Sequence, residues 1–129
     1  MVYSSIPVLL LHGWGGTFEA TWRAHGWVDA LERAGRTVIA IDLPGHGTSA
    51  GVPNPAPEIF ADLAGAIRER IAHIPVIDVV GFSLGGKIAL ALACSADDGG
   101  RYRRVVAAGV GANALSPERV AAPVVNALR

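Results

Sequence analysis

Short, nearly continuous apolar runs divide the chain and predict its strands. They lie at residues 7–11, 37–41, 76–80 and 104–110. Runs rich in valine, isoleucine and leucine, without polar alternation, are typical of parallel strands that helices cover on both faces. We therefore expect each run to form a strand that is buried on both faces of a mostly parallel sheet.

Helical patterns lie between these runs. Ile59, Leu63, Ile67 and Ile71 recur every four residues, which indicates an amphipathic helix. Residues 18–34 form a less regular helix candidate that Gly26 weakens and Gly35 would end. Residues 87–94 are apolar nearly all round, as in a central buried helix. Ser116-Pro117 resembles a further helix start. The alternation predicts an α/β fold with about four strands, flanked by helices and joined by right-handed crossovers.

Composition narrows the class of protein. The 129 residues are 51% apolar and 17% charged, as in one compact domain, and eleven basic residues balance eleven acidic ones. The chain therefore has no net positive charge that would attract it to nucleic acid or to an anionic membrane. No segment approaches the roughly 18 apolar residues of a membrane span. Cys94 is the only cysteine and no Cys or His cluster has zinc spacing, so we expect a cytoplasmic protein without metal or cofactor.

The strongest chemical signal is Gly81-Phe82-Ser83-Leu84-Gly85, which matches G-x-S-x-G between a predicted strand and a predicted helix. A serine on such a sharp turn has a strained backbone, and glycines two positions away on either side remove side chains that would collide. The turn lifts the Ser83 hydroxyl clear of the sheet at a helix N-terminus, where the dipole favours developing negative charge. The motif predicts that Ser83 is a nucleophile, with a chance match as the alternative.

Two further segments complete a resemblance to the serine-type α/β-hydrolase superfamily. His12-Gly13-Trp14-Gly15-Gly16 follows the first predicted strand and resembles the family's His-Gly oxyanion-hole loop, and residues 42–49 (DLPGHGTS) resemble the loop after its next strand. The resemblance implies that the backbone N–H groups of Trp14 and Leu84 hold the oxyanion. It also implies that certain residues shape the site, namely His12, Gly13, Gly15, Gly81 and Gly85.

Other candidate residues have plainer interpretations. His12 and His46 are candidates for a general base, but the resemblance assigns the motif histidines to loop shaping. His25 and His73 lie in helical patterns without a motif around them, which favours exposed or helix-terminal histidines. We interpret Asp42 as an anchor of its loop and Asp78 as a buried, paired carboxylate.

The family pattern stops before its catalytic triad is complete. The expected order is serine, acid, histidine, but no histidine follows Ser83, and Asn113 stands where some members place the acid. We expect residues 1–129 to be a single partial domain, running from the oxyanion strand through the strand after the nucleophile to the start of the lid region. This would be a truncated α/β-hydrolase fold, about the first half of an ordinary member, whose general base and acid lie outside this chain.

By this resemblance, the function is carboxylic-ester hydrolysis through an acyl-enzyme on Ser83. Trp14, Trp22 and Phe82 suggest an apolar pocket for a small apolar acyl substrate. The alternatives are an inactive binding or assembly module, and a relative that performs carbon–carbon cleavage or acyl transfer. Without its neighbour, the strand at residues 104–110 would be an apolar sheet edge, which predicts self-association through that edge.

Overall fold

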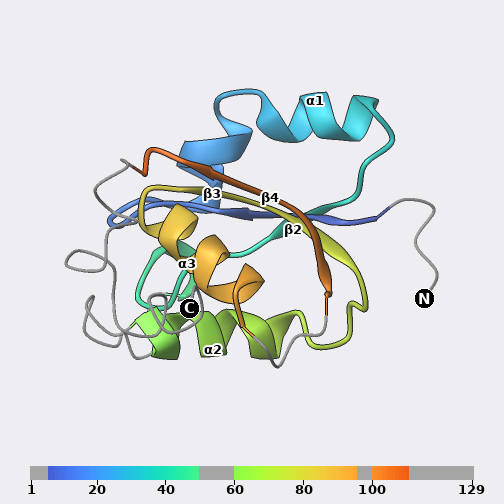
Figure 1. Cartoon of the computed structure of the whole chain (residues 1–129). Coiled ribbons are helices and arrows are strands. Elements are labelled where there is room, and N and C mark those ends of the chain that lie inside the picture. Colours follow the sequence, from blue (N-terminus) through green and yellow to red (C-terminus); the bar gives the residue numbers. More distant parts are fainter. Residues whose placement is uncertain (1–5, 50–59, 96–99, 111–129) are drawn as a thin grey trace.

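A computed structural model describes residues 6–49, 60–95 and 100–110 (Figure 1). The elements follow in the order β1 (Val8–Leu11), η1 (Glu19–Arg23), α1 (Trp27–Arg33), β2 (Val38–Ala40), η2 (Gly47–Ser49), α2 (Phe60–Arg70), β3 (Ile77–Phe82), α3 (Leu84–Ala93) and β4 (Tyr102–Ala108). The four predicted strands are confirmed. Ile59, Asn113, the helix start at Ser116 and the lid region lie outside the described residues.

The four strands form one parallel sheet in the order β2-β1-β3-β4. Helices α2 and α3 cover one face, and η1 and α1 lie on the other (Figure 1). Alternate side chains of β1 point to opposite faces of the sheet. Leu9 and Leu11 pack in the core under α2 and α3, whereas Val8 and Leu10 pack in the smaller core under η1 and α1. This is the predicted α/β fold.

Burial on both faces holds for the central strands only. All of β1 is buried, and so is most of β3, but β2 and β4 lie at the edges of the described sheet and are partly exposed. On β4, the inner residues Val105 and Tyr102 pack against the core of α2 and α3. Val106 points to the other face and is 53% exposed. The prediction for residues 104–110 was therefore wrong on one face, because no described helix covers it.

The predicted helix at residues 18–34 is interrupted. The chain forms a π-helix, η1, then a turn, then α1, and Gly26 between them has a left-handed φ of 82°. A left-handed residue cannot continue a right-handed helix, so Gly26 divides the segment. Gly35, with φ of 78°, ends α1, and the N–H of Arg36 bonds back to the carbonyl of Leu31, as predicted for a glycine stop.

Asp78 is buried and paired, as its place inside a strand predicted. Its carboxylate accepts hydrogen bonds from Arg36 at 2.6 Å and from Arg103 at 2.6 and 3.0 Å. Burial raises the pKa of Asp78, but the bonds from the two arginines outweigh burial and hold the pKa below its usual value. Asp78 thus ties the segment before β2 to the edge strand β4.

Candidate active site

The candidate site lies where the chain reverses its direction across the sheet. From β1 the chain crosses to β2 on one side, and from β2 it returns past β1 to β3 on the other. Ligands of open α/β sheets bind at the carboxyl ends of strands that flank such a switch point. The loop that follows β1 and the serine that follows β3 meet at this place, because a Cβ on Gly13 would lie 3.3 Å from the Cβ of Ser83.

Ser83 occupies the turn between β3 and α3 in a strained conformation. Its φ is 55° and its ψ is −115°, and it is the only non-glycine residue with positive φ among those that the structure describes. Such a conformation costs on the order of 1–3 kcal/mol and persists only when its surroundings impose it. Here the N–H of Ser83 donates to the carbonyl of Ala108 at 2.9 Å, while the Ser83 carbonyl accepts from Lys87 at 3.1 Å.

The glycines around Ser83 allow backbone to touch backbone. A Cβ on Gly81 would collide with the carbonyl of Gly85, and a Cβ on Gly85 would collide with the carbonyl of Leu11. The first turn of α3 therefore sits directly on the end of β1. Leu84 is the first residue of α3, so its N–H is one of the helix donors that have no intrahelical partner. This donor lies next to Ser83 in the chain.

The loop after β1 is a tight turn with a glycine at its bend. The N–H of Gly16 donates to the carbonyl of Gly13 at 3.1 Å, and Gly15 has a φ of 76°. A positive φ at the third residue only is the signature of a type II turn, which explains the glycine at position 15. Trp14 occupies the second position, and its side chain is 54% exposed.

His12 supports this loop as a neutral, fully buried ring. Its Nε2 accepts a hydrogen bond from the N–H of Leu43 at 3.0 Å, so its Nδ1 carries the proton and donates to the carbonyl of Gly13 at 2.7 Å. Burial lowers the pKa of His12, and the bond to Gly13 and the nearby Asp42 oppose this only in part. With both nitrogens engaged, His12 cannot act as the general base for Ser83.

The loop after β2 repeats the same construction. Pro44 and Gly45 form a second turn, in which Gly45 has a φ of 79° and the N–H of His46 donates to the carbonyl of Leu43 at 2.9 Å. The Nε2 of His46 accepts from the N–H of Gly15 at 2.8 Å, and its Nδ1 donates to the carbonyl of Pro44 at 3.0 Å. Both nitrogens of His46 are engaged as well, which excludes it as a base in this conformation.

Asp42 anchors the second loop. Its carboxylate accepts from the N–H of Phe18 at 2.7 Å and from the N–H and hydroxyl of Thr48, each at 2.8 Å. Burial raises the pKa of Asp42, but these three bonds outweigh burial, so the pKa lies below its usual value. Gly47 packs over the carboxylate, where a Cβ would collide with it. All the hydrogen bonds of this carboxylate are structural.

The remaining histidines are exposed. His25 lies in the turn between η1 and α1, and His73 follows α2 in the turn that leads to the start of β3. Ser83 follows the far end of β3, so His73 is at the opposite edge of the sheet. Within residues 6–49, 60–95 and 100–110, no hydrogen bond joins the Ser83 hydroxyl to a histidine or a carboxylate. The described site thus holds a serine in a strained turn, next to the first N–H of α3.

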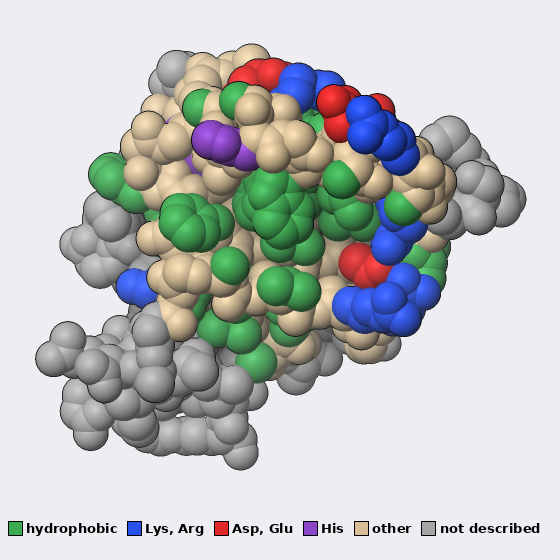
Figure 2. All heavy atoms as spheres, turned by 90° about the horizontal axis from the view of Figure 1, so that it is seen from above, with side chains coloured by type: hydrophobic (Ala, Val, Ile, Leu, Met, Phe, Trp, Pro, Cys, Tyr) green, Lys and Arg blue, Asp and Glu red, His purple; other side chains and the backbone are tan. Residues whose placement is uncertain are grey.

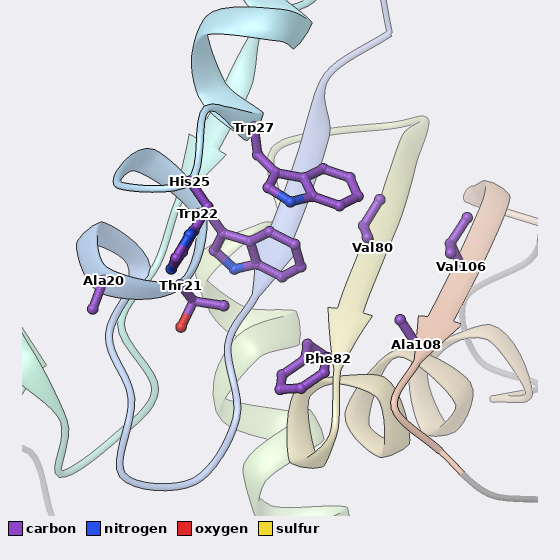
Figure 3. Close-up of a pocket in the computed structure, with 9 residues that line it drawn as sticks. All are labelled: Ala20, Thr21, Trp22, His25, Trp27, Val80, Phe82, Val106 and Ala108. Carbon is purple, nitrogen blue, oxygen red and sulfur yellow. The ribbon is translucent and has the colours of Figure 1, made fainter.

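An apolar hollow of about 540 Å³ lies on the sheet face beside α1 (Figures 2 and 3). Most of its lining is apolar or aromatic: Ala20, Trp22, Trp27, Val80, Phe82, Val106 and Ala108, and the polar residues Thr21 and His25 complete it. The predicted pocket thus includes Trp22 and Phe82 but not Trp14, whose ring packs edge-on against His46 with centroids 5.1 Å apart. Trp27, which sequence reasoning missed, lines the hollow because the bend at Gly26 turns it back over Trp22; their centroids are 5.1 Å apart.

Comparisons with known proteins agree with this geometry. Residues 6–122 match the model of the alpha/beta hydrolase fold family. A curated relative, 2-succinyl-6-hydroxy-2,4-cyclohexadiene-1-carboxylate synthase of Escherichia coli (strain K12), is 32% identical over 90 residues, which are 67% of this chain and 32% of the relative. The matched segment thus spans about a third of the length of this curated relative.

Two solved structures extend the likeness to three dimensions. An esterase from Exiguobacterium antarcticum is 27% identical, with a TM-score of 0.59 over 74% of this chain and 34% of its own. A hydrolase from Pseudomonas aeruginosa PA01 is 29% identical, with a TM-score of 0.59 over 79% of this chain and 37% of its own. None of the described helices is long and apolar enough to cross a membrane. The chain belongs to the α/β-hydrolase fold family.

Proposed function

We propose that this chain supplies the nucleophile and the oxyanion-binding part of a serine hydrolase that cleaves carboxylic esters. The observation that carries this proposal is Ser83 itself, held at a φ of 55° between β3 and α3, with the Gly13 loop packed against it. Natural proteins retain such local strain mainly at functional sites. A serine that served only as a helix cap would adopt an ordinary β-region backbone.

The proposed chemistry follows from the groups around Ser83. Its Oγ attacks the ester carbonyl carbon and loses its proton to a general base, and the carbonyl oxygen becomes an oxyanion that the N–H groups of Trp14 and Leu84 stabilise. Collapse of this intermediate expels the alcohol, which takes the proton from the base, and leaves an acyl-enzyme. Water then gives a proton to the base and attacks the acyl carbon; the acid is released, and Ser83 Oγ takes the proton back from the base. Loss of one oxyanion donor would cost about 3 kcal/mol of transition-state stabilisation.

The general base and its orienting acid would come from residues outside the described ones. His12 and His46 have both ring nitrogens engaged, and Asp42 and Asp78 are held in structural hydrogen bonds. We propose an apolar acyl compound as the substrate, because Phe82 adjoins Ser83 and lines the apolar hollow. The structural likeness to an esterase supports ester hydrolysis.

One comparison favours a second reaction on the same site. The curated relative with 32% identity is named a synthase, not a hydrolase. The serine turn and the two backbone donors would serve carbon–carbon bond chemistry as readily as ester hydrolysis, since both reactions build negative charge on an oxygen. Substrate trials that pair esters with carbon–carbon cleavage substrates would separate these alternatives.

A fluorophosphonate probe tests the proposed nucleophile. Such a probe phosphonylates an active-site serine, and mass spectrometry of the digested protein locates the modified residue. We expect modification at Ser83 that disappears in Ser83→Ala and persists in Ser95→Ala, a matched serine removal just beyond α3. Equal modification of several serines, or none in a folded protein, would favour an inactive binding module. Parallel assays with p-nitrophenyl acetate would show whether a base reaches Ser83 in this chain.

A further inference from the structure

The wall of the apolar hollow contains an N–H group without a partner. Trp22 lines the hollow and is only 3% exposed. Its Nε1, the one polar atom of the indole, is buried and has no hydrogen-bond partner among the described residues. Native proteins keep few buried donors of this kind, because each one costs about 1–3 kcal/mol. The unpartnered N–H therefore indicates an acceptor that comes from outside the described residues.

The hollow around this donor suits a small molecule. Its volume of about 540 Å³ falls within the roughly 300–1,000 Å³ of ordinary ligand pockets. Such pockets combine a mostly apolar lining with a few polar groups that fix the orientation of the ligand. Here Trp27, Phe82 and Val106 supply apolar surface, and Trp22 supplies a hydrogen-bond donor.

Exposed side chains control access to the Trp22 nitrogen. In Figure 3 the nitrogen edge of the indole lies on the side of Thr21 and His25, which line the same hollow. His25 is exposed and Thr21 is half-buried, and exposed side chains change rotamer within picoseconds to nanoseconds. An acceptor in the hollow can therefore reach Nε1 when these side chains rotate. Because the N–H is already dehydrated, only the acceptor loses water when the hydrogen bond forms.

We propose that the hollow binds an apolar carbonyl compound whose oxygen accepts a hydrogen bond from Nε1 of Trp22. A neutral carbonyl fits better than a carboxylate, because no lysine or arginine lines the hollow. This inference rests on the proposed function only where it identifies the compound as part of the ester that Ser83 attacks. The carbonyl at Trp22 is then a second one, since the reacting carbonyl is assigned to the N–H groups of Trp14 and Leu84.

A matched pair of compounds tests this proposal by NMR. Acetophenone carries a carbonyl oxygen, and α-methylstyrene has the same shape with a methylene group in its place. Each compound is titrated into the whole chain, and the amide of Val106 and the indole N–H of Trp22, assigned from through-space contacts, report binding in the hollow.

Three variants accompany the wild-type chain. Trp22→Phe keeps an aromatic ring and removes the N–H. Trp27→Phe makes the same substitution in the same hollow and is the matched control. Ser83→Ala removes the proposed nucleophile. Circular dichroism establishes that each variant is folded, and the Trp22 signal of the wild-type chain provides a test that does not depend on any variant.

We expect acetophenone to bind about fivefold more tightly than α-methylstyrene, since a net hydrogen bond is worth about that factor. Only acetophenone should move the indole proton of Trp22 downfield, because only its oxygen accepts the bond. The preference for acetophenone should vanish in Trp22→Phe and persist in Trp27→Phe and in Ser83→Ala.

Equal affinity for the two compounds, or a preference that survives in Trp22→Phe, would overturn the proposal. A preference that disappears in Ser83→Ala would also overturn it, because the carbonyl would then lie at the oxyanion site. Absence of binding by either compound would leave a second copy of the chain as the occupant of the hollow and would refute the ligand site. If a fluorophosphonate fails to modify Ser83, the proposed function fails, but the comparison of the two compounds still decides what Trp22 binds.

Discussion

At the scale of single residues, the candidate site is made of backbone groups that glycines bring close together. Gly81, Gly85 and Gly13 each stand where a side chain would meet the backbone or Ser83. Gly15 has a different reason, since no atom lies within 4 Å of its Cβ position but its φ is 76°. The glycines of these motifs therefore have two different causes: some allow close approach of the backbone, and Gly15 allows a left-handed backbone.

The strain at Ser83 predicts an unusual order of stabilities. Glycine adopts a φ of 55° without a Cβ penalty, whereas alanine keeps the penalty that serine has. Ser83→Gly should therefore be more stable than Ser83→Ala by about 1 kcal/mol, although glycine normally destabilises a folded chain. Urea unfolding measures both. An alanine variant as stable as the glycine variant would argue against strain at this turn.

Two glycine-to-alanine substitutions should act in opposite directions. A Cβ on Gly85 would collide with the carbonyl of Leu11, which is buried backbone that cannot move aside. Gly65 lies inside α2 with nothing within 4 Å of its Cβ position. We expect Gly85→Ala to lose about 3 kcal/mol or more, and Gly65→Ala to gain up to about 1 kcal/mol. Thermal unfolding compares them, and similar shifts would contradict the packing described.

Buried His12 makes stability depend on pH. Burial lowers its folded-state pKa below the ordinary value of 6.5, so the folded chain binds fewer protons than the unfolded chain between these two pKa values. The contribution of neutral His12 to the free energy of unfolding is therefore complete above about pH 6.5. This contribution is lost as the pH falls toward the folded-state pKa of His12. The free energy of unfolding, followed by urea denaturation from about pH 8 to pH 5, should decline on acidification, and less steeply in His12→Gln. An unchanged slope in that variant would refute this role.

At the scale of elements, hydrophobic runs predicted the strands well and the helices unevenly. Residues 7–11 and 76–80 are apolar because β1 and β3 are covered on both faces, and that pattern is local. The helix at residues 18–34 is divided at Gly26, the residue that weakened its predicted pattern, but the pattern alone does not predict a complete break there. The partly exposed face of β4 depends on which helices cover the sheet, which its own sequence does not contain.

In the candidate site too, features set by neighbouring residues were predictable, and features that join distant residues were not. The serine turn was predictable, since G-x-S-x-G is a local motif with a steric cause. The reciprocal bonds of His12 and His46 were not, because each joins residues 31 positions apart. The resemblance assigned both histidines to loop shaping, but nothing in the sequence indicated which backbone groups each ring would bind.

The ion network at Asp78 should stabilise the association of β4 with the sheet. Its carboxylate accepts from Arg36, from Arg103 and from the backbone N–H of Arg104. Asp78→Ala removes all three and should cost about 2 kcal/mol of unfolding free energy. Glu32→Ala on exposed α1 is the control and should change it by less than about 0.5 kcal/mol. Denaturant titration of both tests this, and equal effects would mean that the network is not stabilising.

At the scale of the whole molecule, the parallel sheet has unequal cover. Helices α2 and α3 protect one face, whereas on the other face the hollow leaves Trp27, Phe82 and Val106 between 45% and 53% exposed. Parallel sheets are normally covered on both faces, and contiguous exposed apolar surface marks a site of association. Figure 2 shows this surface, with hydrophobic side chains gathered at its centre.

This surface and the adjoining edge of β4 lead us to propose self-association. Val106→Lys places a charge in the hollow and should lower the association constant at least tenfold, because a buried lysine loses its hydration. Val76→Lys is the matched control, since Val76 is 39% exposed but does not line the hollow. Sedimentation equilibrium over a range of concentrations measures both. A wild-type chain that stays monomeric at high concentration would sink this proposal.

We propose that Ser83 and two backbone amides form one reactive centre, and the structure of a phosphonylated protein is the most direct test. After reaction with a fluorophosphonate, crystallography would locate the phosphonyl oxygen. We expect an adduct on Ser83 Oγ, with that oxygen about 2.7–3.1 Å from the nitrogens of both Trp14 and Leu84. An adduct on another residue, or a phosphonyl oxygen that faces solvent and contacts neither nitrogen, would contradict it.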